Sequence, residues 1–106
     1  MAGAEISSGV CGFTTFVEAT KDGRGRVVLT IESDCKAVQC LAEELSEVDA
    51  LQEITFRGTG PLTMELAAKH LRHAACPVPV GIVKTVEVAA GLALPVDVTI
   101  KLSSNS

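Results

Sequence analysis

Hydrophobic and polar residues alternate in two stretches near the start of the chain. Residues 10–20 and 26–33 place apolar or small side chains at nearly every second position. A period of two is typical of a β-strand that has one covered face. The Asp22-Gly23 pair between the stretches favours a tight turn, because glycine tolerates a positive φ angle. We therefore expect an antiparallel β-hairpin.

The position of the turn predicts which residues face each other. A turn centred on Gly23 places Cys11 opposite Cys35. Facing positions in an antiparallel pair bring side chains close together. The hairpin therefore predicts two thiols side by side at its open end.

The remaining sequence mixes helical and strand-like spacing. We expect helices over 35–48, 61–75 and 80–90, and strands over 52–57 and 95–102. With the hairpin, the order β-β-α-β-α-α-β predicts an α+β two-layer sandwich with helices on one face of a mostly antiparallel sheet. A chain of 106 residues has the length of one domain, so we expect a single domain over residues 1–106.

Charge and composition exclude several classes of protein. The net charge is −4, the nine lysines and arginines form no stripe, and the three phenylalanines are the only aromatic residues. Binding to nucleic acids is therefore not expected. No apolar run approaches the roughly 18 residues of a membrane span, and no targeting segment is visible, so we expect a cytoplasmic protein without membrane contact.

Four cysteines are the strongest chemical signal in the chain. Cytoplasmic thiols stay reduced, which favours metal binding or catalysis over disulfides. Cys35 lies at the start of an expected helix, where the helix dipole stabilises a thiolate, the form that binds metals. Cys11, Cys35 and Cys76, with Cys40 or His73 as the fourth ligand, would complete a tetrahedral site for zinc or an iron–sulfur cluster.

Two histidines precede the last cysteine at intervals of three residues. In a continuous helix, this spacing would place His70 and His73 on one face, with Cys76 just beyond the helix end. Imidazole and thiolate groups are good ligands for zinc and iron. His73 is nearer to the cysteine and is therefore the preferred ligand of the two.

The order of these residues resembles the NifU-type iron–sulfur cluster scaffold family. In that family a Cys-Gly pair precedes the strand pair, a second cysteine opens the following helix, and a third follows a histidine near a later helix. Here Cys11-Gly12, Cys35 and Cys76 with His73 hold these places. The resemblance implies that the three cysteines bind a cluster, with His73 as a possible fourth ligand, and that a protein partner takes part in cluster or sulfur transfer.

The sequence also departs from that family. Phe13 stands where the family has an acidic residue, and Ala74 and Ala75 separate the histidine from the cysteine. The whole chain is also similar to small prokaryotic domain families of unknown function, which implies a fold and no activity.

These observations leave three functional hypotheses. The first is assembly, carriage or storage of a metal or iron–sulfur cluster, without catalytic turnover. The second is a sulfur carrier or thiol enzyme, in which Cys35 is the nucleophile and His73 the base. The third is a structural or interaction module without a metal, for example a homodimer formed through an exposed aliphatic sheet face.

Overall fold

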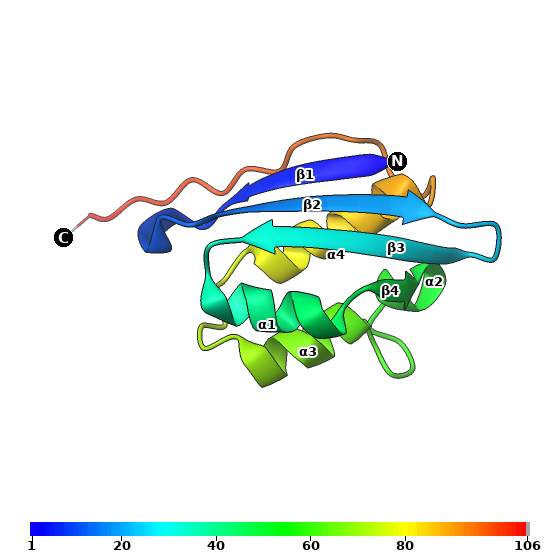
Figure 1. The fold of residues 1–106 in the computed structure, drawn as a ribbon. Coiled ribbons are helices and arrows are strands. Elements are labelled where there is room, and N and C mark those ends of the chain that lie inside the picture. Colours follow the sequence, from blue (N-terminus) through cyan, green and yellow to red (C-terminus); the bar gives the residue numbers. More distant parts are fainter. Residues whose placement is uncertain (106) are drawn as a thin grey trace.

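A four-stranded antiparallel sheet forms the centre of the computed structural model, which describes residues 1–105. Its strands lie in chain order, as Figure 1 shows: β1 (Ala2–Ser7), β2 (Thr14–Lys21), β3 (Arg26–Ser33) and β4 (Glu47–Asp49). Ser106, the last residue of the expected domain, lies outside the described residues.

The helices cover one face of this sheet. They are the short 3₁₀ helix η1 (Gly9–Cys11) and the α-helices α1 (Lys36–Glu44), α2 (Ala50–Glu53), α3 (Leu62–His70) and α4 (Val78–Ala89). Helix α4 packs on β1 and β2, α1 packs on β3, and α3 contacts both of these helices. The expected α+β class, with helices on a mostly antiparallel sheet, is confirmed.

The alternation in the hairpin strands gives the sheet one covered and one open face. Val17, Val27 and Leu29 are buried beneath the helices, whereas Phe16 and Val28 on the opposite face are about half exposed. Successive side chains of a strand point to opposite faces, so the pattern of the sequence determines which set is buried. This part of the prediction is confirmed.

The register of the hairpin differs from the expected one. Thr15 lies opposite Ser33, and not opposite residue 31 as a turn centred on Gly23 requires. The reason is a longer turn: Asp22 Oδ1 accepts the N–H groups of Arg24 (2.8 Å) and Arg26 (3.1 Å). This carboxylate moves the centre of the turn to residue 24. The predicted pairing of Cys11 with Cys35 is therefore wrong.

The predicted helix over 35–48 and the strand over 52–57 are also corrected. The helix ends at Glu44, and Val48 pairs with Val27 as part of β4. The carboxylate of Asp49 then accepts the N–H groups of Leu51 and Gln52, which starts the short helix α2 where a strand was expected. An aspartate at an N-cap favours a helical turn, and this local signal outweighs a weak alternation.

Two other boundaries changed and one strand was missed. Helix α3 ends at His70, five residues before the predicted end, and α4 begins at Val78. Strand β1 was not predicted, because its alternating positions hold mostly alanine and glycine and give little hydrophobic contrast.

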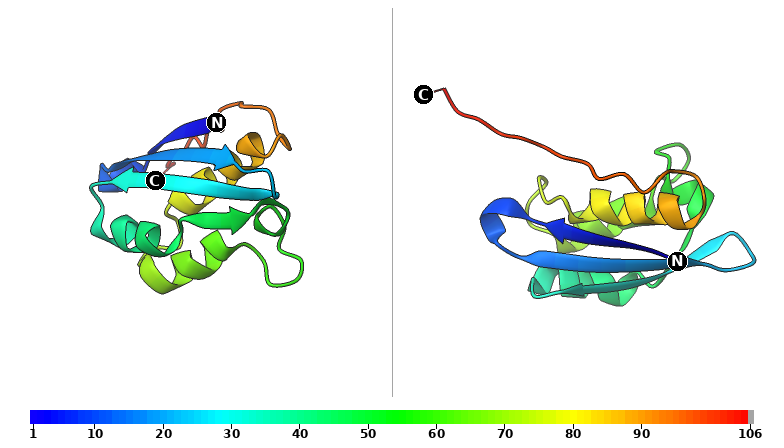
Figure 2. Two further views of the ribbon diagram at one scale, coloured as in Figure 1. Left: turned by 45° about the vertical axis from the view of Figure 1, so that its right-hand side comes forward. Right: turned by 90° about the horizontal axis from the view of Figure 1, so that it is seen from above.

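The predicted strand over 95–102 is not a strand in the described part of the chain. This segment follows the loop after α4, and the right-hand view of Figure 2 shows it extending away from the helices. Its alternating aliphatic side chains are exposed, because no neighbouring strand covers them. Among residues 1–105, no helix is both long enough and apolar enough to cross a membrane.

Candidate functional site

The four cysteines are free thiols in different environments. Cys11 is exposed on η1 and Cys40 is exposed on α1, whereas Cys35 and Cys76 are half-buried against the hydrophobic core. Figure 1 shows that η1 and the first turns of α1 and α4 all lie at the same end of the molecule. Three of the predicted ligands, Cys11, Cys35 and Cys76, therefore share one end of the fold.

Cys35 and Cys76 both lie at the start of a helix. Cys35 is the N-cap of α1, and its N–H donates to the hydroxyl of Ser33 at 3.1 Å. Cys76 directly precedes Pro77, the N-cap of α4. Both thiols therefore lie next to the first turn of a helix, whose N–H groups have no partners within the helix.

A complete metal site is not formed by the described residues. Within residues 1–105, no group of three or more histidine, cysteine, aspartate and glutamate side chains is arranged to hold a metal ion. His73 is exposed in the loop after α3, so the predicted sharing of one helix face with His70 is wrong. The ligand roles of Cys11, Cys35, Cys40, Cys76 and His73 stay predictions, as does the pairing of Cys35 with His73 in a thiol enzyme.

His70 instead belongs to a polar cluster that links α1 to α3. Glu44 on α1 contacts His70 Nε2 through Oε2 and pairs with Lys69 Nζ through Oε1 at 3.0 Å. The hydrogen bond from His70, followed by that from Lys69, lowers the pKa of Glu44 below its ordinary value of 4.5. The cluster links the two helices at the surface.

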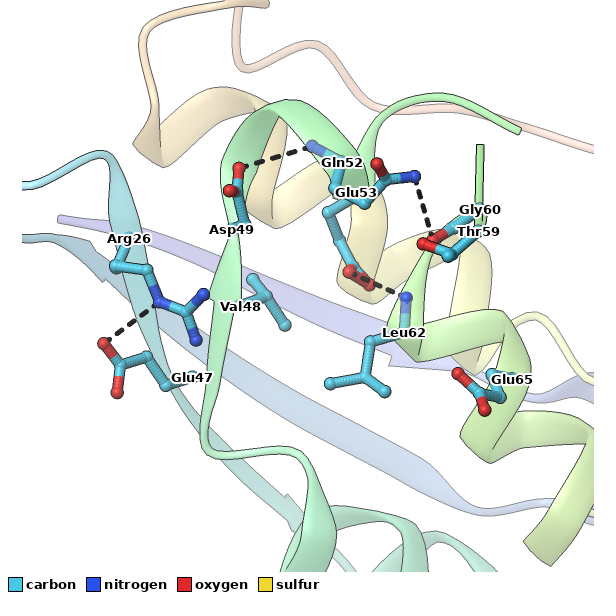
Figure 3. A pocket seen from close by; sticks show the side chains of 10 residues that line it. All are labelled: Arg26, Glu47, Val48, Asp49, Gln52, Glu53, Thr59, Gly60, Leu62 and Glu65. Carbon is cyan, nitrogen blue, oxygen red and sulfur yellow. Dashed lines mark hydrogen bonds and ion pairs between the residues drawn. The ribbon is translucent and has the colours of Figure 1, made fainter. Parts of the chain in front are cut away.

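A shallow pocket of about 180 Å³ lies between β4, α2 and the start of α3 (Figure 3). Beside it, the buried carboxylate of Glu53 accepts the N–H groups of Leu62 (3.1 Å) and Thr63 (2.6 Å). The first N–H groups of a helix need acceptors, and α3 has no capping side chain of its own. Glu53 is therefore the anion at this helix end, and its role is structural.

Sequence reasoning missed both of these carboxylates. Glu53 has one signal in the sequence: Pro61 opens a helix without a capping side chain, so an acceptor must come from elsewhere. Glu44 has no such signal in the sequence, because its partners Lys69 and His70 lie on another helix, 25 and 26 residues later.

A row of exposed aliphatic side chains lies along the C-terminal segment, defined here as residues 94–102. Five aliphatic side chains alternate along it, with exposed fractions from 60% at Val98 to 90% at Leu102. The members of this set are Leu94, Val96, Val98, Ile100 and Leu102. Contiguous exposed apolar surface on a folded protein marks an interaction site. Strand addition to a sheet edge is one way in which extended segments bind in other proteins.

Comparisons with known proteins give one match. A model described as "Family of unknown function (DUF6951)" matches residues 2–102. No curated protein and no solved structure matches the chain. The match confirms the expected similarity to a domain family of unknown function. It covers nearly the whole chain, which therefore belongs to this family of unknown function.

Proposed function

We propose that the protein is a structural interaction module that acts by associating with further copies of itself through its C-terminal segment. One observation carries this proposal: five aliphatic side chains alternate along residues 94–102, and all are at least 60% exposed. Leaving this much aliphatic surface in water is unfavourable, so the segment gains free energy from any surface that covers it.

The polar residues of the segment support the same function. Asp97, Thr99 and Lys101 occupy the alternate positions, so one side of an extended chain is apolar and the other polar. This pattern is typical of a strand in a sheet with one covered face. The segment therefore has the sequence of a strand without a partner strand in the described structure.

Sedimentation analysis of the purified protein across a wide range of concentration tests this function. We expect wild-type protein to self-associate and the double variant Val98→Lys, Ile100→Lys to be monomeric, because the added charges prevent burial of the apolar side. Thr99→Lys is the matched control, since it adds a charge to the polar side and should leave association unchanged. A wild-type protein that is monomeric at every concentration contradicts the proposal.

A metal or iron–sulfur site, including a NifU-like role, is the second candidate function. The observation that favours it is the shared position of Cys11, Cys35 and Cys76 at one end of the molecule (Figure 1), two of them at helix starts. Cys40 or His73 would be the fourth ligand. Because the described residues form no complete ligand group, this function requires a rearrangement of η1 or ligands from a second copy.

The metal hypothesis has a direct test. Protein purified without oxygen would contain stoichiometric iron and sulfide, or zinc, and an iron–sulfur cluster would add visible absorbance. Cys35→Ala and Cys76→Ala should each abolish the metal content. Protein that folds with neither metal contradicts the hypothesis and leaves the self-association proposal unaffected.

A further inference from the structure

The sheet ends in β1 on one side and in the three-residue strand β4 on the other, and β1 is the longer of the two edges. Strand β1 is the first strand in the order β1-β2-β3-β4, so one of its edges faces no other strand among the described residues. An edge strand presents a row of unpaired N–H and C=O groups that can pair with another chain.

The register of β1 identifies the residues whose backbone points outward. Ser8 N–H donates to Phe13 O at 3.0 Å, which marks this position as a hydrogen-bonded pair of the β1–β2 ladder. Hydrogen-bonded and non-hydrogen-bonded pairs alternate along an antiparallel ladder. The N–H and C=O groups of Gly3, Glu5 and Ser7 therefore point away from β2, toward the open edge.

The side chains of β1 match those of the C-terminal segment. Ala4 and Ile6 face the helices, and Gly3, Glu5 and Ser7 lie on the open face. A strand added beside β1 would need apolar side chains at every second position on the helix side and polar ones on the other. The C-terminal segment has this alternation.

Helix α4 extends the apolar surface beneath the open edge. Gly81 of α4 lies directly under Ile6, since a Cβ atom there would be 2.3 Å from Ile6 Cδ1. Val88 follows two turns later on the same side of α4 and is only half-buried. Aliphatic side chains of an added strand would therefore lie beside Val88, with the exposed Lys84 on the same side of the helix between Val88 and Gly81.

We propose that two copies of the chain exchange their C-terminal segments, each segment adding a fifth strand to the open edge of β1 in the other copy. A twofold arrangement is the reason for choosing a second copy, because every chain carries both a donor segment and a receiving edge, so both are used at once. The six residues of β1 match the six residues 97–102, and Pro95, which lacks an N–H group, stays outside the ladder. This inference rests on the proposed self-association and names its partner surface.

Separate variants of the β1 edge and of the C-terminal segment test the two sides of this contact. Glu5→Pro removes an outward N–H group without removing a β1–β2 hydrogen bond, and Glu5→Ala controls for the lost carboxylate. We expect Glu5→Pro to raise the Kd of the dimer by about tenfold or more, since the block occurs twice in the symmetric pair, and Glu5→Ala to leave it unchanged. Ser7→Pro, which lies at the end of the strand, is the second variant if Glu5→Pro does not fold.

Mixing two defective proteins gives the decisive result. Glu5→Pro keeps an intact segment, and the Val98→Lys, Ile100→Lys variant keeps an intact edge, so a mixed pair retains one unblocked contact and the mixture should associate more tightly than either variant alone. The exchange is overturned if Glu5→Pro dimerises as tightly as Glu5→Ala, or if the mixture associates no more tightly than the separate variants. If only the segment variant dissociates, self-association stands and the β1 edge is the wrong surface.

Discussion

At the residue scale, the buried carboxylate of Glu53 determines how α3 begins. We expect Glu53→Ala to lower the free energy of unfolding by about 2 kcal/mol, because two helix N–H groups, one of them buried, lose their acceptor. Urea unfolding followed by circular dichroism measures this change. Glu43→Ala, at an exposed position of α1, is the control, and equal losses in both variants would contradict a capping role for Glu53.

A second residue-scale prediction concerns Glu44 and acid pH. Because its pKa in the folded protein is below the ordinary value of 4.5, its contribution to stability is present above that value. The contribution is lost as the pH falls through the lowered pKa. Urea unfolding of wild type and Glu44→Gln at a series of pH values should therefore show a difference in stability that shrinks toward acid pH. Glu43→Gln, at an exposed position, is the control and should change the free energy of unfolding by the same amount at every pH. A difference between wild type and Glu44→Gln that also stays constant with pH would contradict the lowered pKa of Glu44.

At the scale of elements, the close approach of α4 to β1 depends on Gly81. A Cβ atom at this position would overlap Ile6 Cδ1 (2.3 Å) and Cγ1 (2.6 Å). We expect Gly81→Ala to destabilise the protein by about 1 kcal/mol, since overpacking of 1–3 kcal/mol outweighs the gain in helix propensity of about 1 kcal/mol.

A double-mutant cycle checks this assignment. Ile6→Ala removes all the atoms that would overlap, so Gly81→Ala should be neutral or stabilising in that background. Thermal unfolding of the four proteins provides the measurement. Equal effects of Gly81→Ala with and without Ile6 would show that the helix–strand contact is not the cause.

At the scale of the whole molecule, segment exchange predicts that stability depends on protein concentration. A tenfold increase in concentration favours a dimer by about 1.4 kcal/mol, so the Tm of wild type should rise with concentration. The Tm of the Val98→Lys, Ile100→Lys variant should not, because a monomer gains nothing from concentration. Calorimetry at several concentrations measures both, and a constant wild-type Tm would argue against assembly.

The sequence by itself determined the features that depend on neighbouring residues. The alternation predicted strands over 10–20 and 26–33, which the structure has at Thr14–Lys21 and Arg26–Ser33, with Gly9–Cys11 in a 3₁₀ helix instead. Its phase placed Val17, Val27 and Leu29 on the covered face, because side chains of a strand alternate regardless of what covers them. The two later helices were also determined locally, to within a few residues at their ends.

Turn contacts and contacts between distant residues were decided only by the tertiary structure. The hairpin register depended on one carboxylate, Asp22, which the alternation does not encode, and the predicted pairing of Cys11 with Cys35 failed for that reason. The partners of Glu53 and Glu44 came from other helices, which periodicity cannot identify.

The conformation of the C-terminal segment depends both on its local sequence pattern and on contacts with other parts of a structure. Its sequence determined that it is suited to be a strand, because alternation is a local property of the chain. Whether it is a strand depends on a neighbouring edge, since a strand needs hydrogen-bonding partners outside itself. The structure shows these residues exposed and the edge of β1 open, and a second copy of the chain can supply each with its partner.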